Sequence, residues 1–308
     1  MKSKCAAGHG WLQMGYIDII ATTPSSSDES QDTIQYVAKS KESNKLCLVK
    51  QITCKNIVIF AEKRDLIKKL SSNDSLNIFP YFDYYVDPES MTVVYSQLLS
   101  ESIESEIKTP ADPLTRLKKA LVVLYDCVNG LLSAQKQSIV HLNIKPSNLC
   151  NLDGLYKLKE WNTIECFLQE REAVNHEHGA GFYQAPELFE LKETYKVQQH
   201  CLKADIFSLG VVLLEYLGVP KNDLLGINRR SEKFHELALK ALMESHFKTY
   251  YFDLIYDLCF QMLQKDPQRR ISAQELKFSL EEFFQDSSFK AIPVILCFWA
   301  FLTFHHCS

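Results

Sequence analysis

The sequence predicts an α+β fold in two lobes: a small lobe of antiparallel strands with one helix, followed by a larger, mainly helical lobe. Two observations predict it. Over the first hundred residues, short runs rich in β-branched and aromatic side chains alternate with polar turns, whereas after Leu99 apolar residues recur at helical spacing. The chain of 308 residues is 46% apolar and 23% charged, which supplies a core of this size and excludes a wholly disordered chain.

The small lobe is expected to hold five strands and one helix. Residues 24–32 are rich in serine and acidic side chains, which predicts a solvated loop between the first two strands. Apolar residues recur at helical spacing over about 56–70, and this spacing places Lys63, not Glu62, on the inward face of the helix. The strand candidates are residues 16–20, 33–38, 46–52, 79–86 and 91–98.

The large lobe opens with a long amphipathic helix that includes Leu114 and Leu132. Further helices are expected at roughly 203–217, 231–245, 252–264 and 272–284. The predicted domain covers residues 11–284, with a small lobe over about 11–98, a large lobe over about 99–284 and an apolar tail over 285–308.

The tail contains 18 residues, 291–308, without a formal charge. This length is borderline for crossing a bilayer, which takes about 20 predominantly apolar residues. Three interpretations stay open at this point. The segment is a terminal helix packed on the fold, the end of a truncated or alternatively spliced product, or a contact with a membrane.

The composition excludes several classes of function. The formal net charge is −4, so the chain is not expected to bind nucleic acid. Its ten cysteines occur singly, without a C-x-x-C pair, which signals neither a zinc site nor a disulfide framework. Polar residues interrupt the N-terminal segment where a secretory signal would need an apolar core. A reducing, cytoplasmic location is therefore expected, with membrane association only through the tail.

Four motifs follow one another along the chain. Residues 141–148 read His-Leu-Asn-Ile-Lys-Pro-Ser-Asn and residues 179–187 read Gly-Ala-Gly-Phe-Tyr-Gln-Ala-Pro-Glu. Residues 204–210 read Ala-Asp-Ile-Phe-Ser-Leu-Gly, and residues 266–270 read Asp-Pro-Gln-Arg-Arg. In this order they resemble the catalytic loop, the end of the activation segment, the central helix and a late loop of the eukaryotic protein kinase superfamily. The resemblance covers about residues 11–284 and implies the bilobal protein-kinase fold.

The resemblance also shows where the catalytic parts differ from those of the family. Asn143 stands at the position of the catalytic aspartate, and an amide is not a base at neutral pH. Losing the general base typically costs about 10²- to 10⁴-fold in rate. Lys145 and Asn148 are retained. Glu160 replaces the aspartate that would hold Mg²⁺, in the sequence Glu-Trp-Asn. The extra methylene displaces the carboxylate of Glu160, so Glu160 and Asn148 are expected to bind Mg²⁺ weakly or not at all.

The nucleotide side of the site is degenerate too. Lys50 resembles the lysine that pairs with the α- and β-phosphates, and its usual partner would be a glutamate such as Glu62 on the following helix. Leu48 replaces the alanine that packs on adenine. Residues 21–32, where the family has a glycine-rich phosphate loop, contain no glycine. The same stretch contains Asp28, Glu29 and Asp32, so binding of ATP and Mg²⁺ is expected to be weak or absent.

The scaffold residues of the family are retained. Glu187 and Arg270 match its buried ion pair, Asp205 matches the aspartate that binds the catalytic loop, and His141 is kept. Leu142 replaces the arginine that grips an activation-loop phosphate. This combination predicts a pseudokinase that binds and regulates another protein, with little or no phosphate transfer. The alternative is an active or weakly active Ser/Thr-type kinase.

Overall fold

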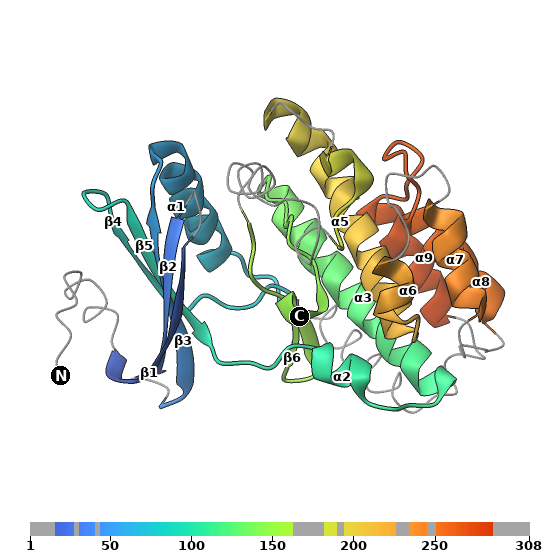
Figure 1. Ribbon diagram of the computed structural model, residues 1–308, viewed down its shortest axis with the longest axis horizontal. Coiled ribbons are helices and arrows are strands. Elements are labelled where there is room, and N and C mark those ends of the chain that lie inside the picture. Colours follow the sequence, from blue (N-terminus) through green and yellow to red (C-terminus); the bar gives the residue numbers. More distant parts are fainter. Residues whose placement is uncertain are drawn as a thin grey trace.

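The computed structural model describes residues 16–27, 31–40, 44–162, 182–189, 194–225, 234–244 and 251–285. It has the two lobes that the sequence predicts, with the sheet of the small lobe beside the helices of the large one (Figure 1). Residues 11–15 and 286–308 lie outside the described residues, so the predicted start of the domain and nearly all of the apolar tail do too.

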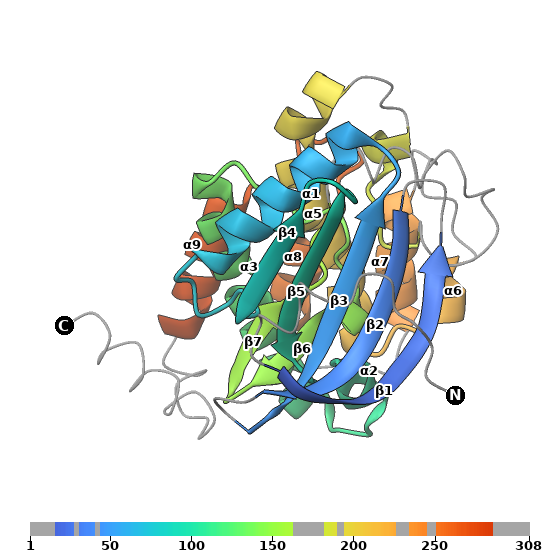
Figure 2. The same cartoon turned by 90° about the vertical axis from the view of Figure 1, so that its left-hand side faces the viewer.

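The small lobe is a five-stranded antiparallel sheet with the strand order β1-β2-β3-β5-β4 (Figure 2). Helix α1 (Ile57–Ser71) packs against one face of it. Asn56 caps this helix, because its side-chain oxygen accepts a hydrogen bond of 2.7 Å from the backbone N–H of Val58. The strands are β1 (Tyr16–Ser27), β2 (Gln31–Ser40), β3 (Leu46–Cys54), β4 (Asp83–Asp87) and β5 (Thr92–Leu98).

Two of the strand predictions need correction. Strand β1 continues to Ser27, so the first part of the predicted 24–32 loop is strand: Ser26 pairs with Thr33 and Ser27 with Asp32. Backbone pairing with β2 satisfies these polar residues, which a pattern of side chains does not show. Strand β4 begins at Asp83 and not near residue 79, because the chain before it is bound to the large lobe.

The inward face of α1 carries a charged residue in the middle of an apolar stripe. Lys63 is only 5% exposed, whereas Glu62 is half-buried, as the helical spacing predicts. The apolar members of the stripe are Ile59, Phe60, Leu66, Ile67 and Leu70.

The large lobe is built around the long helix α3 (Pro113–Lys136), which Asp112 caps. Helix α5 (Thr194–Tyr216) begins about nine residues earlier than the apolar pattern predicts. None of the helices in the described ranges has both the length and the apolarity needed to cross a bilayer. The remaining elements are α2 (Glu104–Lys108), η1 (Pro146–Asn148), β6 (Leu149–Leu152), β7 (Leu155–Leu158), η2 (Pro186–Phe189), α6 (Lys221–Leu225), α7 (Phe234–Glu244), α8 (Phe252–Met262) and α9 (Ala273–Gln285).

The loop between α1 and β4 joins the two lobes. The N–H of Phe79 donates to the carbonyl of Leu158 in β7, and the N–H of Leu158 donates to the carbonyl of Asn77, both at 2.9 Å. Helix α3 approaches this loop at Gly130, where an added Cβ would lie 2.8 Å from the carbonyl oxygen of Asn77. Glycine is therefore required at this position for the helix to pack so closely.

Candidate nucleotide and catalytic site

Lys50 and Glu160 form an ion pair where the resemblance places the nucleotide. The pleat of β3 puts Lys50 on the same face as Ile52 and Cys54, which pack in one core with α1. Glu160 follows the end of β7, and its Oε2 accepts a hydrogen bond from Lys50 Nζ. The lysine side chain is 9% exposed and the glutamate side chain 26%. The two charges thus neutralise each other in a largely buried position.

Helix α1 adds a second cation on this side of the sheet. Lys63 lies on the inward face, and none of the described carboxylates forms a salt bridge with it. Lys50 and Lys63 are the two buried charged side chains of the small lobe among the described residues. The inward face of α1 therefore carries Lys63 and not Glu62 as its buried charged residue.

Asn143 links the loop of residues 141–148 to the segment that contains Glu160. Its Nδ2 donates to the backbone carbonyl of Glu160 at 2.9 Å, and its own N–H donates to Nδ1 of His141 at 3.2 Å. Asn148 Nδ2 donates in turn to the carbonyl of Asn143 at 2.7 Å. These bonds hold the loop against the Glu160 segment, and an amide used in this way offers no base to a substrate hydroxyl.

The residues present do not fit a divalent cation well. Glu160 is engaged by Lys50, so a cation would have to displace an ammonium group from its carboxylate. Asn148 is buried and donates from Nδ2 to the carbonyl of Asn143, so its Oδ1 is the one amide atom that it could offer to a cation. Lys145 is half-buried. Within the described ranges, no group of three or more His, Cys, Asp or Glu side chains is arranged to hold a metal ion.

Two tyrosines close the site behind the ion pair, and sequence reasoning missed them. Tyr95 in β5 is the register partner of Lys50, and its ring centroid lies 5.2 Å from that of Tyr81. Burial, reinforced by the charge of Glu160, raises the pKa of Tyr95 well above its usual value, so its hydroxyl stays neutral. The sequence carries no local signal of this contact, because it depends on the register between β3 and β5.

Only part of the segment at the position of the phosphate loop lies in the described residues. Asp28 and Glu29 lie outside the described residues. Asp32 forms a surface ion pair of 3.1 Å with Lys55. Its charge is therefore compensated, and the expected repulsion of phosphates rests on the other two acidic residues.

Asp205 holds the catalytic loop by hydrogen bonds to its backbone. Its two carboxylate oxygens accept the backbone N–H groups of His141 at 2.8 Å and Leu142 at 2.9 Å. Leu142 has a φ of 59° and is buried, so it anchors the turn in the core in place of an arginine. Trp161 packs on the His141 ring with a centroid separation of 4.4 Å and donates from Nε1 to the carbonyl of Leu158 at 3.3 Å.

His141 makes the stability of the fold depend on pH. Burial lowers the pKa of its imidazole from 6.5 to about 3. Below about pH 6.5 the imidazole is therefore protonated in the unfolded chain but not in the folded one. For each unit by which the pH falls, this residue lowers the free energy of unfolding by about 1.4 kcal/mol. We expect the stability of the wild type to fall relative to that of His141→Phe between pH 6.5 and 3, as measured by urea unfolding. Parallel curves for the two proteins would contradict a neutral, buried His141.

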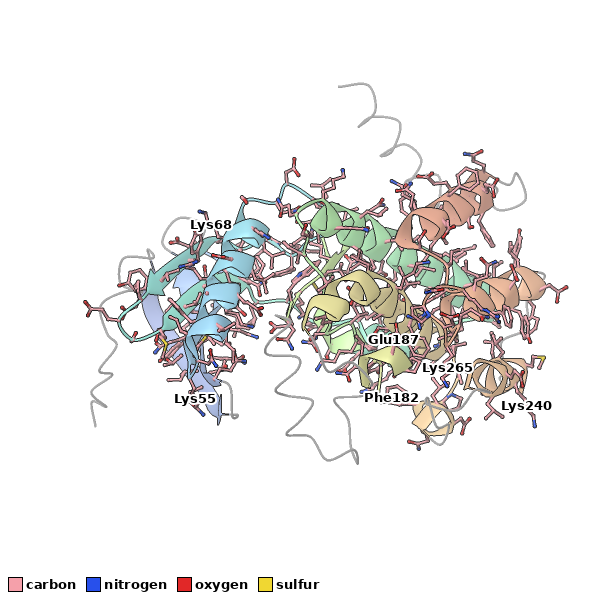
Figure 3. The ribbon with its side chains drawn as sticks, turned by 90° about the horizontal axis from the view of Figure 1, so that it is seen from above. Lys55, Lys68, Phe182, Glu187, Lys240 and Lys265 are labelled. Atoms are coloured by element: carbon pink, nitrogen blue, oxygen red, sulfur yellow. The ribbon has the colours of Figure 1, made fainter. Side chains whose placement is uncertain are left out.

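Glu187 and Arg270 form a two-pronged ion pair inside the large lobe. Arg270 Nη1 and Nη2 lie 2.5 and 2.9 Å from the two carboxylate oxygens of Glu187. The guanidinium also donates to the backbone carbonyls of Lys203, Gln264 and Lys265, and its side chain is fully buried. Figure 3 labels Glu187 and Lys265 in this part of the lobe. This ion pair fixes the end of the activation segment to the loop that precedes α9.

The described end of the activation segment leaves no exposed tyrosine. Tyr183 is 6% exposed, and its hydroxyl donates to Glu215 at 2.6 Å. Thr163 lies outside the described residues. The burial of Tyr183 therefore denies a kinase access to its hydroxyl, and Leu142 stands where the family has the arginine that binds an activation-loop phosphate.

A family model described as protein kinase domain matches residues 33–279. Serine/threonine-protein kinase pakG of Dictyostelium discoideum is 26% identical over 78% of this chain and 20% of its own length. The Wee1-like protein kinase of Oryza sativa subsp. japonica is 26% identical over 70% of this chain and 38% of its own length. This chain thus spans less than half the length of these relatives. Because the family model matches most of the chain, the chain belongs to the protein kinase domain family.

Proposed function

We propose that this protein is a pseudokinase, which binds and regulates another protein and transfers little or no phosphate. The observation that carries the proposal is the ion pair between Lys50 and Glu160. In an active site of this family the lysine binds phosphates and the carboxylate binds Mg²⁺. Here the two groups form an ion pair with each other.

The reach of Glu160 explains the pairing. An aspartate at this position would be one methylene shorter, whereas the glutamate side chain extends to Lys50 Nζ. A nucleotide with its cation would have to break this ion pair, and both charged groups would then need new partners. Lys63 adds a positive charge on the inward face of α1, without a salt bridge to any of the described carboxylates, and this charge further disfavours a divalent cation.

The missing base supports the same conclusion independently. The Asn143 side chain donates to the backbone carbonyl of Glu160, so neither its chemistry nor its geometry serves a hydroxyl nucleophile. In contrast, the bonds of Asp205 and Arg270 that maintain the fold are complete. A fold that keeps its scaffold without its chemistry is suited to presenting a surface to a partner protein.

The first test is a thermal melt of the full chain with millimolar ATP, alone and with Mg²⁺ or Mn²⁺. Binding to the folded state must stabilise it, by about 2.7 kcal/mol at a hundredfold excess over the dissociation constant. We expect no shift for the wild type. Glu160→Asp shortens the carboxylate and releases Lys50, so this variant is expected to gain a shift that needs Mg²⁺. A metal-dependent shift in the wild type that Lys50→Met abolishes would overturn the proposal.

An active Ser/Thr-type kinase is the second candidate, because Lys50 contacts Glu160 and Asn148 is linked to Glu160 through the hydrogen bonds of Asn143. Phosphate transfer to a generic basic protein substrate separates the two. The second candidate requires wild-type transfer that Lys50→Met removes. Our proposal predicts a rate at background for both proteins.

A further inference from the structure

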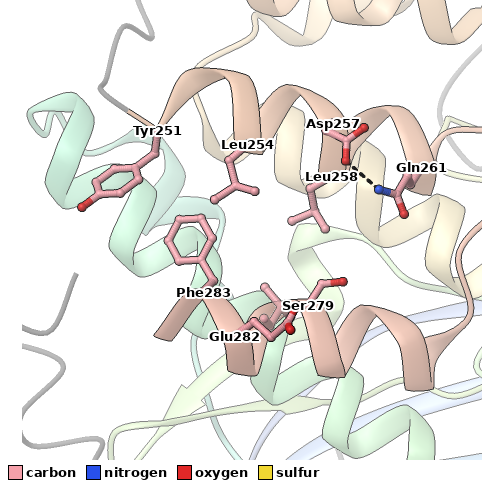
Figure 4. A pocket seen from close by; sticks show the side chains of 9 residues that line it. Tyr251, Leu254, Asp257, Leu258, Gln261, Ser279, Glu282 and Phe283 are labelled. Carbon is pink, nitrogen blue, oxygen red and sulfur yellow. Dashed lines mark hydrogen bonds between the residues drawn. The ribbon is translucent and has the colours of Figure 1, made fainter. Parts of the chain in front are cut away.

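Helices α8 and α9 enclose a groove far from the kinase cleft. We call it the α8–α9 groove; Tyr251, Leu254 and Leu258 line one wall and Leu280, Glu282 and Phe283 the other (Figure 4). Its volume is about 290 Å³. Three of its lining residues, Gln261, Ser279 and Glu282, also line a more open depression that continues to Phe278.

The groove exposes apolar side chains that a folded chain normally covers. Leu254, which lines the groove, is 50% exposed, and Phe278, which lines the adjoining depression, is 59% exposed. Contiguous apolar surface of this kind marks a site of contact. Its rim is acidic, with the carboxylates of Asp257 and Glu282 on opposite walls.

The chain itself contains a segment that matches this surface. Helix α9 forms one wall and ends at Gln285, so only residues 286–290 separate it from the uncharged segment that begins at 291. A connection of this length reaches about 20 Å when extended, enough to return along the groove. The segment supplies large apolar side chains and no carboxylate that the acidic rim would repel. Lys290, which precedes it directly, is complementary in charge to Glu282. The apolar residues include Ile292, Val294, Ile295, Leu296, Phe298 and Trp299.

We propose that residues 291–304 bind in the α8–α9 groove of the same chain. The apolar segment then covers part of the large lobe and is not a membrane anchor. Its release would expose Leu254 and Phe278 to solvent. This inference does not depend on whether the kinase cleft transfers phosphate.

The first experiment is photo-crosslinking of the full chain with benzoylphenylalanine in place of Leu254. We expect a cross-link to a peptide from 291–304 within the same chain, with a yield that does not change on dilution. The matched control carries the same group in place of Leu237, an exposed leucine on α7 outside the groove, and is expected to give no such product. A product that joins two chains, or the absence of any cross-link to 291–304, would overturn the proposal.

The second experiment keeps the test independent of the bulky probe. Leu254→Asp and deletion of residues 291–308 are each expected to lower the melting temperature of the chain, by about 2 to 4 °C. Because both remove the same contact, the combined variant should melt no lower than the worse single variant. Leu237→Asp should instead add its effect to that of the deletion. Additive effects for Leu254→Asp, or pelleting of the wild type with phosphatidylcholine vesicles without a cross-link from position 254, would refute docking in the groove.

Discussion

Replacing Arg270 with alanine is expected to lower the free energy of unfolding by about 3 to 5 kcal/mol, because it leaves a nearly buried carboxylate without its partner. Glu187 would lose both of its guanidinium hydrogen bonds, and the backbone carbonyls of Lys203 and Gln264 would lose their donors. Urea unfolding monitored by circular dichroism measures this loss.

The neighbouring residue supplies the control for this prediction. Arg269 carries the same charge, but its side chain is 80% exposed and its contact with Asp266 is 3.8 Å long. Arg269→Ala should change the stability by no more than about 0.5 kcal/mol. If Arg270→Ala does not fold, Glu187→Gln, which keeps the shape of the side chain, is expected to fold with reduced stability. Equal stabilities for the Arg269 and Arg270 variants would contradict the structural role of the ion pair.

Trp161→Ala is expected to cost about 3 to 5 kcal/mol, the range for removal of a buried aromatic side chain. The Trp161 side chain is 5% exposed and packs directly on His141, so its removal opens a cavity beneath the catalytic loop. The same urea unfolding experiment measures the loss.

A conservative variant separates packing from hydrogen bonding at this position. Trp161→Phe keeps a ring on His141 but loses the 3.3 Å bond from Nε1 to the carbonyl of Leu158. It should therefore cost less than half as much as the alanine variant. If Trp161→Ala were as stable as the wild type, the segment after Glu160 would not be held by this side chain.

Much of the fold was predictable because its signals are local. Helical spacing over 15 residues is sufficient to place Lys63 on the inward side of α1, and the run of apolar residues in α3 identifies the central helix of the large lobe. The end of β1 was not predictable in the same way. Its polar residues become strand only because β2 lies beside them and supplies the backbone partners.

The site shows a sharper limit. The sequence identifies Lys50 and Glu160 individually through their motifs, but 110 residues separate them and nothing local indicates that their side chains meet. That contact depends on one methylene group and on how β7 is placed against β3. Tyr95 was missed for a similar reason, because its relation to Lys50 is one of register between strands.

The hydrogen bonds between Phe79, Leu158 and Asn77 have a consequence for how the molecule comes apart. These backbone groups belong to different lobes and find their partners only across the boundary. Pulling the lobes apart would leave them unsatisfied beside a core that contains residues from both sides, at about 1 to 3 kcal/mol for each group. The two lobes therefore form a single cooperative unit, in which damage to one lobe lowers the resistance of the other to unfolding. We expect motion between them to keep these hydrogen bonds, and therefore to be a rotation about this contact and not a separation.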